Sequence, residues 1–294
     1  MKKASTALAY AKLNISLDIV SRMPDGYHNM KMVMQTVRLC DEISVECVPG
    51  EGVRVKPGLP YLPGDERNIA AKAALAFYRH TGISGVRTSI EIEKRIPVGA
   101  GLGGGSSDGA CILRTLNDMF ETGLSMGQLE EIGLTIGSDV PFCVAGGTSL
   151  AEGRGEKLKS LPVLPGCHIV ICKPHFSFST PELFKRIVCE KISSRPDTKG
   201  IIAALNNGDL AGVARRMYNV FEDVLPKGST DVADIKSAML DYGALGVVMT
   251  GSGPAVFGLF DNEVGAIEAH RGLSERFKEC FLTEPVGKIW EMES

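Results

Sequence analysis

The alternation of apolar and polar positions near the N-terminus predicts a β-strand. Residues 12–18 (KLNISLD) carry apolar side chains at the odd-numbered positions and polar side chains at the even-numbered ones. A period of two is typical of a strand with one face against the core and a polar outer face. We therefore expect a half-buried strand here, with further strands at 32–39, 42–48 and 90–93 and a turn at Asp25-Gly26.

A different spacing, with apolar residues every three or four positions, predicts helices in the same half of the chain. This spacing occurs at 68–80, 106–120 and 126–136. Residues 57–65 are rich in proline and glycine and are predicted to form a loop.

The second half alternates predicted strands and helices after a change in composition. Glycine, proline and basic residues gather at 153–166, which predicts a boundary between two domains, 1–157 and 158–294. The alternation predicts an α+β fold in which helices cover an antiparallel or mixed sheet. Strands are expected at 168–172, 245–250, 255–260 and 280–284, and helices at 180–188, 198–206, 209–224, 230–242 and 262–276.

Composition narrows the class of protein. The chain has 294 residues, 44% of them hydrophobic, and a formal net charge of −3, so it has no basic excess for nucleic acid. No apolar run reaches the roughly 18 residues of a membrane span. Charged and polar residues interrupt the apolar start of the chain, and the eight cysteines are scattered without a C-x-x-C pair. We therefore expect a cytoplasmic protein with neither a disulfide framework nor a zinc site.

Residues 97–109 (PVGAGLGGGSSDG) are the strongest candidate for chemistry. Five glycines lie between positions 99 and 105, immediately before a helical apolar pattern. Glycine allows a backbone to approach a ligand closely, and the first N–H groups of a helix attract anions. The alternative is a flexible surface loop, but a linker would not lead directly into a periodic helix. The segment therefore predicts a phosphate-binding loop.

Common nucleotide motifs do not account for this loop. The sequence has no G-x-x-x-x-G-K-[ST] motif, and neither H-R-D-x-x-x-x-N nor D-F-G of protein kinases. Gly99, Gly101 and Gly104 do match G-x-G-x-x-G, but a second helix is predicted where a dinucleotide fold needs a strand.

The loop resembles the ATP loop of the GHMP kinase superfamily, P-x-x-x-G-L-G-S-S-A-A, whose members include galactokinase, homoserine kinase and mevalonate kinase. The G-G-G-S-S-D variant at 103–108 is similar to a branch that acts on a cytidine-diphosphate-linked polyol. Gly109 departs from the alanine usual there. Four more segments resemble the branch in the same order along the chain: 11–17 (AKLNISL), Arg22 with 25–28 (DGYH), 137–142 (GSDVPF) and 250–254 (TGSGP).

The resemblance implies a fold and a reaction. The fold would be an N-terminal domain like ribosomal protein S5 and a ferredoxin-like C-terminal domain, with the active site between them. The reaction would be transfer of the γ-phosphoryl group of ATP to the 2-hydroxyl of 4-diphosphocytidyl-2-C-methyl-D-erythritol, in the methylerythritol phosphate route to isoprenoid precursors. Mg²⁺ would be held mainly by phosphates and water. The partner would be this small molecule, and the protein a monomer or weak homodimer.

The resemblance also assigns roles to residues. Asp139 would accept the proton of the substrate hydroxyl and Lys12 would lie beside it. From the sequence alone, Asp139 could instead cap a turn before Pro141, and Lys12 could be a solvated strand residue. The nucleotide would be bound by Asn68, Lys94, Pro97, Gly99, Gly101, Leu102, Gly103, Gly104, Gly105, Ser106 and Ser107.

Substrate recognition is implied for a further group of residues. Tyr27 and Phe184 would sandwich the cytosine, His28 would bond its edge, and Asn14 would contact the polyol. Thr250, Gly251, Ser252 and Gly253 would face the cleft.

Plainer roles remain open for several of these residues. Phe184 could be core packing, and 251–253 a simple hairpin turn. Asn68, Ser106 and Ser107 could be helix caps.

Two other functions remain open from the sequence. The first is another small-molecule kinase of this superfamily, of homoserine or mevalonate type. The second is an inactive binding protein with the same fold.

Overall fold

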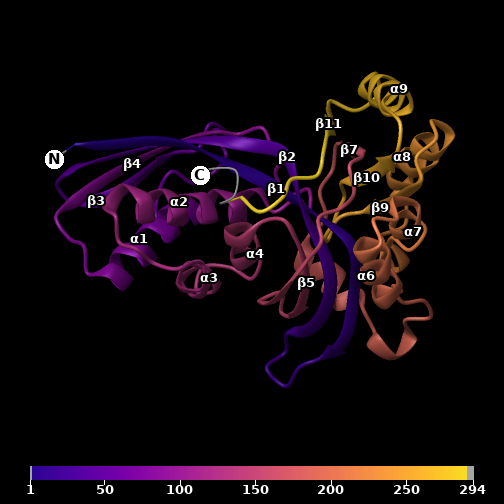
Figure 1. The fold of residues 1–294 in the computed structure, drawn as a ribbon, viewed down its shortest axis with the longest axis horizontal. Coiled ribbons are helices and arrows are strands. Elements are labelled where there is room, and N and C mark those ends of the chain that lie inside the picture. The colour runs from indigo at the N-terminus through magenta and orange to yellow at the C-terminus, as the bar shows by residue number, and fades with distance from the viewer. Residues whose placement is uncertain (1, 290–294) are drawn as a thin grey trace.

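The computed structural model describes residues 2–289, which form two β-sheets with helices packed on them (Figure 1). The first sheet has seven strands in the described residues, and its main path runs β3-β4-β2-β1-β8, with β5 paired to β2 and β6 paired to β5. Its strands are β1 (Lys3–Arg22), β2 (His28–Pro49), β3 (Gly52–Lys56), β4 (Val86–Glu93), β5 (Thr148–Gly153), β6 (Lys157–Leu161) and β8 (Tyr218–Asn219).

The second sheet confirms the ferredoxin-like expectation. Its strands are ordered β11-β7-β10-β9 and every pair is antiparallel. Along the chain they follow the β-α-β-β-α-β order of that motif. The strands are β7 (His168–Lys173), β9 (Gly246–Met249), β10 (Val256–Phe260) and β11 (Glu279–Thr283), and α8 (Thr230–Asp241) and α9 (Glu263–Ser274) pack on them.

Helices of the first half pack on the first sheet and on one another. They are α1 (Ile69–Thr81), α2 (Gly104–Phe120), α3 (Met126–Leu134) and α4 (Val140–Ala145). The first three confirm predicted helices within a few residues. The remaining helical segments are α5 (Thr180–Arg186), η1 (Cys189–Lys191), α6 (Thr198–Asn206), α7 (Leu210–Ala214) and η2 (Val220–Val224).

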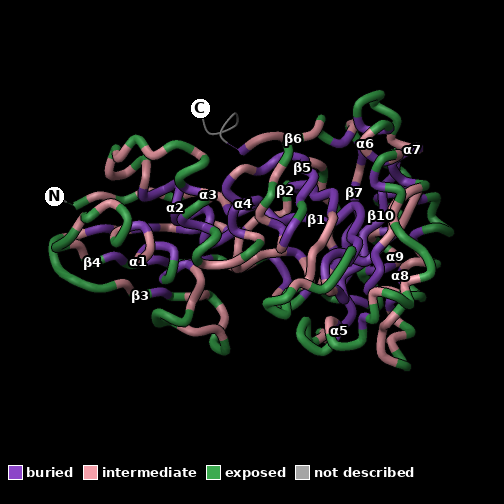
Figure 2. The backbone as a smooth tube through the Cα atoms, turned by 90° about the horizontal axis from the view of Figure 1, so that it is seen from below, coloured by how far each residue is buried: buried purple, intermediate pink, exposed green. Residues whose placement is uncertain are grey.

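The strand predicted at 12–18 is part of the 20-residue β1, and its polar face is not exposed. Lys12, Asn14, Ser16 and Asp18 are all buried, so the expectation of a half-buried strand is wrong. The glycine loop and Asp139 cover Lys12, while Thr250 and Arg195 from the second half of the chain contact Asn14 and Asp18. Figure 2 shows buried residues along β1, β2, β7 and β10 through the middle of the molecule.

The helix predicted at 209–224 is also wrong. Helix α7 ends at Ala214, and Tyr218 and Asn219 then pair in parallel with β1 before the short η2. The apolar spacing of this segment fits a helix, but pairing with the open edge of β1 determines the backbone here.

The halves of the chain are interleaved. Strand β8 from the second half extends the first sheet, and Val286 N–H donates to the Thr36 carbonyl at 2.9 Å. The division into domains 1–157 and 158–294 stays a prediction. Its bounds include residues 1 and 290–294, which lie outside the described part, and residue 157 begins β6 of the first sheet.

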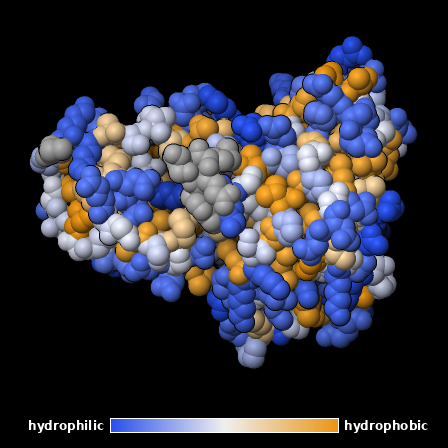
Figure 3. Space-filling view, in the orientation of Figure 1, coloured by the Kyte–Doolittle hydropathy of each residue, from blue (hydrophilic) through white to orange (hydrophobic). Residues whose placement is uncertain are grey.

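Hydrophilic side chains cover most of the face seen in Figure 3, including the projecting tip of the β1–β2 hairpin. Among residues 2–289, no helix is long and apolar enough to cross a bilayer.

Gly109, the departure from the family pattern, lies where α1 and α2 are in close contact. A Cβ at this position would come within 2.9 Å of Cγ2 of Ile69, so a side chain would press the two helices apart. In α3, by contrast, a Cβ on Gly127 would have no atom within 4 Å.

We expect Gly109→Ala to lower the free energy of unfolding by about 1–2 kcal/mol, because overpacking outweighs the gain in helix propensity. The control Gly127→Ala should raise it by about 0.5–1 kcal/mol. Urea unfolding of both variants measures this. Stabilisation by both substitutions would contradict the close packing.

Candidate active site

A cavity of about 1400 Å³ opens between the glycine loop and the second half of the chain. Its wall includes β1, the hairpin tip, the glycine loop, α5 and the 251–253 turn. Ser107 and Thr250 are buried and are not among its lining residues. The other predicted site residues line it: Lys12, Asn14, Tyr27, His28, Asn68, Lys94, Pro97, Gly99, Gly101, Leu102, Gly103, Gly104, Gly105, Ser106, Asp139, Phe184, Gly251, Ser252 and Gly253.

The glycine loop has the backbone of an anion site. Gly99, Gly101 and Gly103 have φ of 64°, 81° and 70°, which glycine adopts without strain. Gly103 is the N-cap of α2, and no side chain caps it. The N–H groups of the first helical turn are therefore open to an external anion.

The loop lies directly against the turn at 250–253. A Cβ on Gly101 would be 2.2 Å from the Thr250 carbonyl oxygen. Ala255 N–H donates to the Ala100 carbonyl at 3.2 Å, and the Thr250 hydroxyl donates to the Gly101 carbonyl at 3.3 Å. The 251–253 segment is both the hairpin turn between the antiparallel strands β9 and β10 and part of the cavity wall, so its role in binding stays a prediction.

Lys12 and Asp139 lie together at this loop, as the resemblance implied. Lys12 Nζ is 3.4 Å from Oδ2 of Asp139, and it donates to Oδ1 of Asn14 at 2.7 Å. The lysine side chain is 5% exposed and the aspartate side chain 33%. A Cβ on Gly103 would be 2.8 Å from Lys12 Cγ, so the lysine stem lies directly against the loop.

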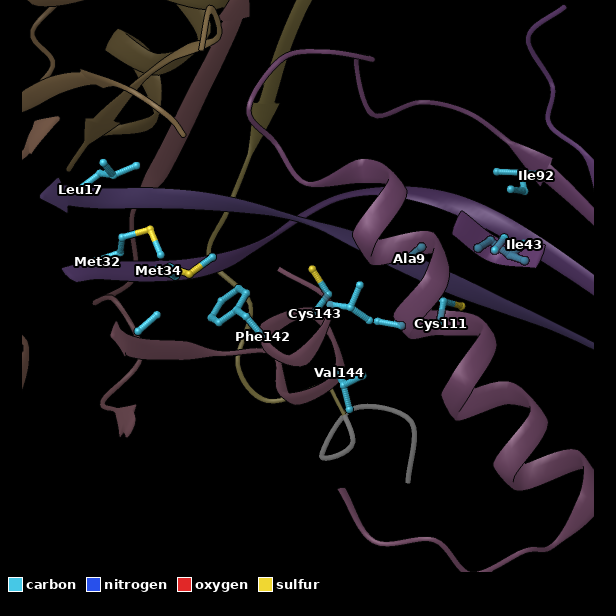
Figure 4. Packing of buried hydrophobic residues seen from close by; sticks show 14 of the residues in the cluster. Ala9, Leu17, Met32, Met34, Ile43, Ile92, Cys111, Phe142, Cys143 and Val144 are labelled. Carbon is cyan, nitrogen blue, oxygen red and sulfur yellow. The ribbon is translucent and has the colours of Figure 1, made fainter. Parts of the chain in front are cut away.

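Asp139 is held in position by the helix that follows it. Asp139 is the N-cap residue of α4, although its side chain makes no cap hydrogen bond. Phe142 and Cys143 of that helix are buried in the core (Figure 4). In the same view Met32 and Met34 of β2 lie beside Phe142. The carboxylate thus projects from a helix anchored by its apolar residues.

A network of buried amides supports the 250–253 turn. Asn219 Nδ2 donates to the carbonyls of Met249 at 2.7 Å and Gly251 at 2.8 Å. The Asn14 N–H donates to the Thr250 hydroxyl at 3.0 Å. Sequence reasoning missed Asn219 because it lay within an expected helix, where a buried polar residue gives no signal.

Lys94 lies under the loop in a buried cluster with two carboxylates. Its Nζ donates to Asp41 at 2.5 Å and to Asp108 at 2.9 Å. Burial opposes the lysine charge, but Asp108 and Asp41 raise the pKa of Lys94 on balance. Burial also raises the pKa of Asp108, to about 7, against the opposing effect of Lys94. Oδ2 of Asp108 accepts from Lys94, but its Oδ1 has no hydrogen-bond partner, so a single lysine faces two carboxylates and one buried oxygen is left unpaired.

The aromatic residues are arranged differently from the implied sandwich. His28 stacks on Phe184 with ring centroids 4.8 Å apart, and Phe184 meets Phe221 edge-on at 5.0 Å. The Tyr27 ring instead lies against Arg154. Burial and then Arg22 lower the pKa of His28, so its ring is neutral near pH 7 and keeps one donor and one acceptor nitrogen.

Two predicted nucleotide contacts already have structural hydrogen bonds. Asn68 caps α1 by accepting from Ala70 N–H at 2.9 Å, and its amide donates to the Pro63 carbonyl at 2.9 Å. The Ser107 hydroxyl donates to the Tyr10 carbonyl at 2.6 Å. The alternative role of Ser106 and Ser107 as caps of this helix is excluded, because α2 begins earlier, after Gly103.

Comparison with known proteins agrees with this geometry. Residues 68–147 match the family model of the GHMP kinases N-terminal domain, and 201–279 match that of the GHMP kinases C-terminal domain. Among solved structures, a 4-(cytidine 5'-diphospho)-2C-methyl-D-erythritol kinase superposes with a TM-score of 0.82 at 31% identity, over 96% of this chain and all of that one. A homoserine kinase from Cytophaga hutchinsonii shares the fold, with a TM-score of 0.76 at 21% identity over 98% of this chain and 96% of that one.

Relatives with similar sequences identify a branch of this family. The chain is 43% identical to 4-diphosphocytidyl-2-C-methyl-D-erythritol kinase of Acetivibrio thermocellus, over 95% of this chain and 98% of the relative. The enzyme of the same name from Clostridium botulinum is also 43% identical, over 95% and 99%. The chain therefore belongs to the GHMP kinase family and, within it, to the 4-diphosphocytidyl-2-C-methyl-D-erythritol kinases.

The cluster under the loop predicts how stability depends on pH. Because the folded Asp108 carboxyl binds its proton more tightly than an unfolded one, stability should fall as pH rises from about 4 to about 7 and then level off. This fall in the free energy of unfolding is on the order of a few kcal/mol, and we expect Asp108→Asn to abolish it. Urea unfolding at pH 5, 6, 7 and 8 measures this, with the exposed Asp241→Asn as control. Parallel curves for wild type and Asp108→Asn would contradict it.

Proposed function

We propose that this protein transfers the γ-phosphoryl group of ATP to the 2-hydroxyl of 4-diphosphocytidyl-2-C-methyl-D-erythritol. One observation carries the mechanism: Lys12 and Asp139 are paired at 3.4 Å beside a glycine loop that opens a helix. The names of the close relatives support the choice of substrate.

On the ATP side of the reaction, the protein would bind the nucleotide phosphates and neutralise their charge. The N–H groups at the start of α2 would hold the nucleotide phosphates, and Lys94 lies beneath them, 3.2 Å from where a Cβ on Gly104 would be. Phosphoryl transfer requires mainly that donor and acceptor be aligned and that charge be neutralised.

On the acceptor side, Asp139 would orient the substrate hydroxyl and take its proton as the new P–O bond forms. Lys12 would stabilise the negative charge on the transferring group. Because Asn14 accepts a hydrogen bond from Lys12 Nζ, the ammonium is fixed next to the carboxylate. In a loose transition state the hydroxyl loses little of its proton before the bond forms, so a carboxylate is basic enough.

The base of the substrate would lie at the other end of the cavity. The stacked rings of His28 and Phe184 offer a flat surface, and neutral His28 can donate to or accept from the cytosine edge. Stacking of a base on an aromatic ring contributes about 1–3 kcal/mol.

Mg²⁺ belongs to the same proposal. Residues 2–289 contain no cluster of three or more His, Cys, Asp or Glu side chains suited to a metal. The cavity carboxylates Asp108 and Asp139 are already paired with Lys94 and Lys12, which fits an ion held chiefly by phosphate oxygens and water. When bound, the ion would neutralise charge on the phosphates.

A monomer or weak homodimer acting in the cytoplasm, without a nucleic-acid partner, completes the proposal. A formal net charge of −3 gives no general attraction to a polyanion.

A parallel substrate panel tests the activity. We expect ATP-dependent phosphorylation of 4-diphosphocytidyl-2-C-methyl-D-erythritol, and turnover of galactose, homoserine and mevalonate lower by orders of magnitude. Preference for homoserine or mevalonate would replace the proposal with another kinase of the family. No transfer to any of the four would favour a binding protein.

We expect Asp139→Asn to lower kcat by roughly 10²–10⁴, the usual contribution of a proton acceptor, with little change in KM. Steady-state kinetics measure both constants. Asp234→Asn removes a carboxylate that pairs with Arg276 away from the cavity, and it should leave both unchanged. Near-normal turnover in Asp139→Asn would exclude this residue from the chemistry.

A further inference from the structure

Arg154 is a cavity residue to which neither the sequence motifs nor the mechanism gave a role. It lies in the turn between β5 and β6 and lines the cavity. Its guanidinium carbon is 3.8 Å from the centre of the Tyr27 ring, and its Nη2 donates to Oδ2 of Asp25. The guanidinium therefore lies beside the tip of the β1–β2 hairpin, where the cytidine is proposed to bind.

The turn that carries Arg154 joins the two ends of the proposed substrate site. Gly153 pairs with Met30 of β2, two residues beyond His28. On the other side, a Cβ on Gly155 would be 3.6 Å from the Ser138 carbonyl oxygen and 4.0 Å from Oδ1 of Asp139. The turn that carries Arg154 therefore contacts the strand that follows His28 on one side and the Asp139 segment on the other.

A substrate that joins a nucleoside to a polyol through a diphosphate places negative charge across this interval. Lys12 and Lys94 are each within 4 Å of an aspartate and are almost fully buried. The Arg154–Asp25 pair is different, because the two side chains are 40% and 46% exposed. Water screens such an exposed pair, so a phosphate can replace the carboxylate at little cost.

The guanidinium group of Arg154 is also suited to bind a diphosphate, and its neighbours already hold it in one orientation. Its planar set of N–H donors matches two phosphate oxygens at once. The Tyr27 ring supports one face, and Arg154 N–H donates to Oε2 of Glu156 at 2.6 Å, which fixes the backbone of the turn. A side chain held in this way loses less conformational entropy on binding.

We propose that Arg154 binds the diphosphate that links the cytidine to the polyol, replacing its contact with Asp25 when substrate arrives. This inference rests on the proposed function. It adds a residue that determines specificity for the diphosphate-linked substrate.

A series of cytidine ligands tests the proposal directly. Binding of cytidine, cytidine monophosphate and cytidine diphosphate to the full chain is measured by calorimetry, with a non-hydrolysable ATP analogue saturating the nucleotide site. In wild type, affinity should rise along the series. In Arg154→Ala, cytidine affinity should stay within twofold of wild type, while diphosphate affinity should fall about 10–100-fold, as expected for charge-assisted hydrogen bonds.

Two further variants separate the contact from general effects. Lys157→Ala removes the same charge three positions away at a residue that does not line the cavity, and it should leave the series unchanged. Arg154→Lys keeps the charge without the planar donors and should recover only part of the diphosphate affinity. In kinetics, Arg154→Ala should raise KM for the cytidine-linked substrate and leave KM for ATP unchanged.

The outcomes distinguish this inference from the proposed function. If Arg154→Ala weakens all three ligands equally, the residue acts only through Tyr27 and the proposal is wrong. The proposal is also wrong if Arg154→Ala binds all three ligands with the affinities of the wild type. If wild type binds none of the cytidine ligands, the proposed function fails, and this inference with it.

Discussion

The contact between two glycine-containing backbone segments determines the geometry of the site. The Gly101 Cα lies so close to the Thr250 carbonyl that a Cβ would be 2.2 Å from that oxygen, and a Cβ on Gly251 would be 2.9 Å from the Gly101 carbonyl oxygen. No side chain fits between these segments. The conformation of the glycine loop in one half of the chain is therefore determined by the backbone of the other half. Lys12, whose N–H donates to the Leu102 carbonyl at 3.0 Å, is aligned by the same loop.

Near the glycine loop, each buried lysine lies within 4 Å of at least one aspartate. The lysine beside the glycine loop, Lys12, has one carboxylate and one amide as partners. The lysine beneath the loop, Lys94, has two carboxylates, and burial raises the pKa of one of them, Asp108, to about 7, so this carboxyl is only partly ionised at pH 7. An anion-binding loop above a doubly charged acidic pair would repel its ligand. A partly protonated pair lessens that repulsion, so the burial of Asp108 favours the binding of an anion at the loop.

The features that depend on local sequence patterns and motifs could be predicted from the sequence. The glycine loop, helix α6 at 198–206 and the strands of the second sheet follow from spacing alone, and the meeting of Lys12 with Asp139 followed from the resemblance. Features set by distant segments could not be predicted. The burial of the polar face of β1, the short strand at Tyr218 and the Ser107–Tyr10 bond all depend on contacts between residues far apart in sequence. Arg154 gave no signal, because a single arginine in a turn is ordinary until its neighbours are known.

The interleaving of the halves has a consequence for how the chain is made. The first sheet receives β8 from the second half, and after β11 the chain returns to it, where Pro285 bridges to Val37 and Lys288 to Gly146. A ribosome releases the N-terminal residues first. The edge of the first sheet at β1 therefore stays unpaired until residues 218 and 219 of β8 have emerged. The glycine loop acquires its opposing wall only after residues 250–253 have emerged, so a nascent chain shorter than this has no complete cavity.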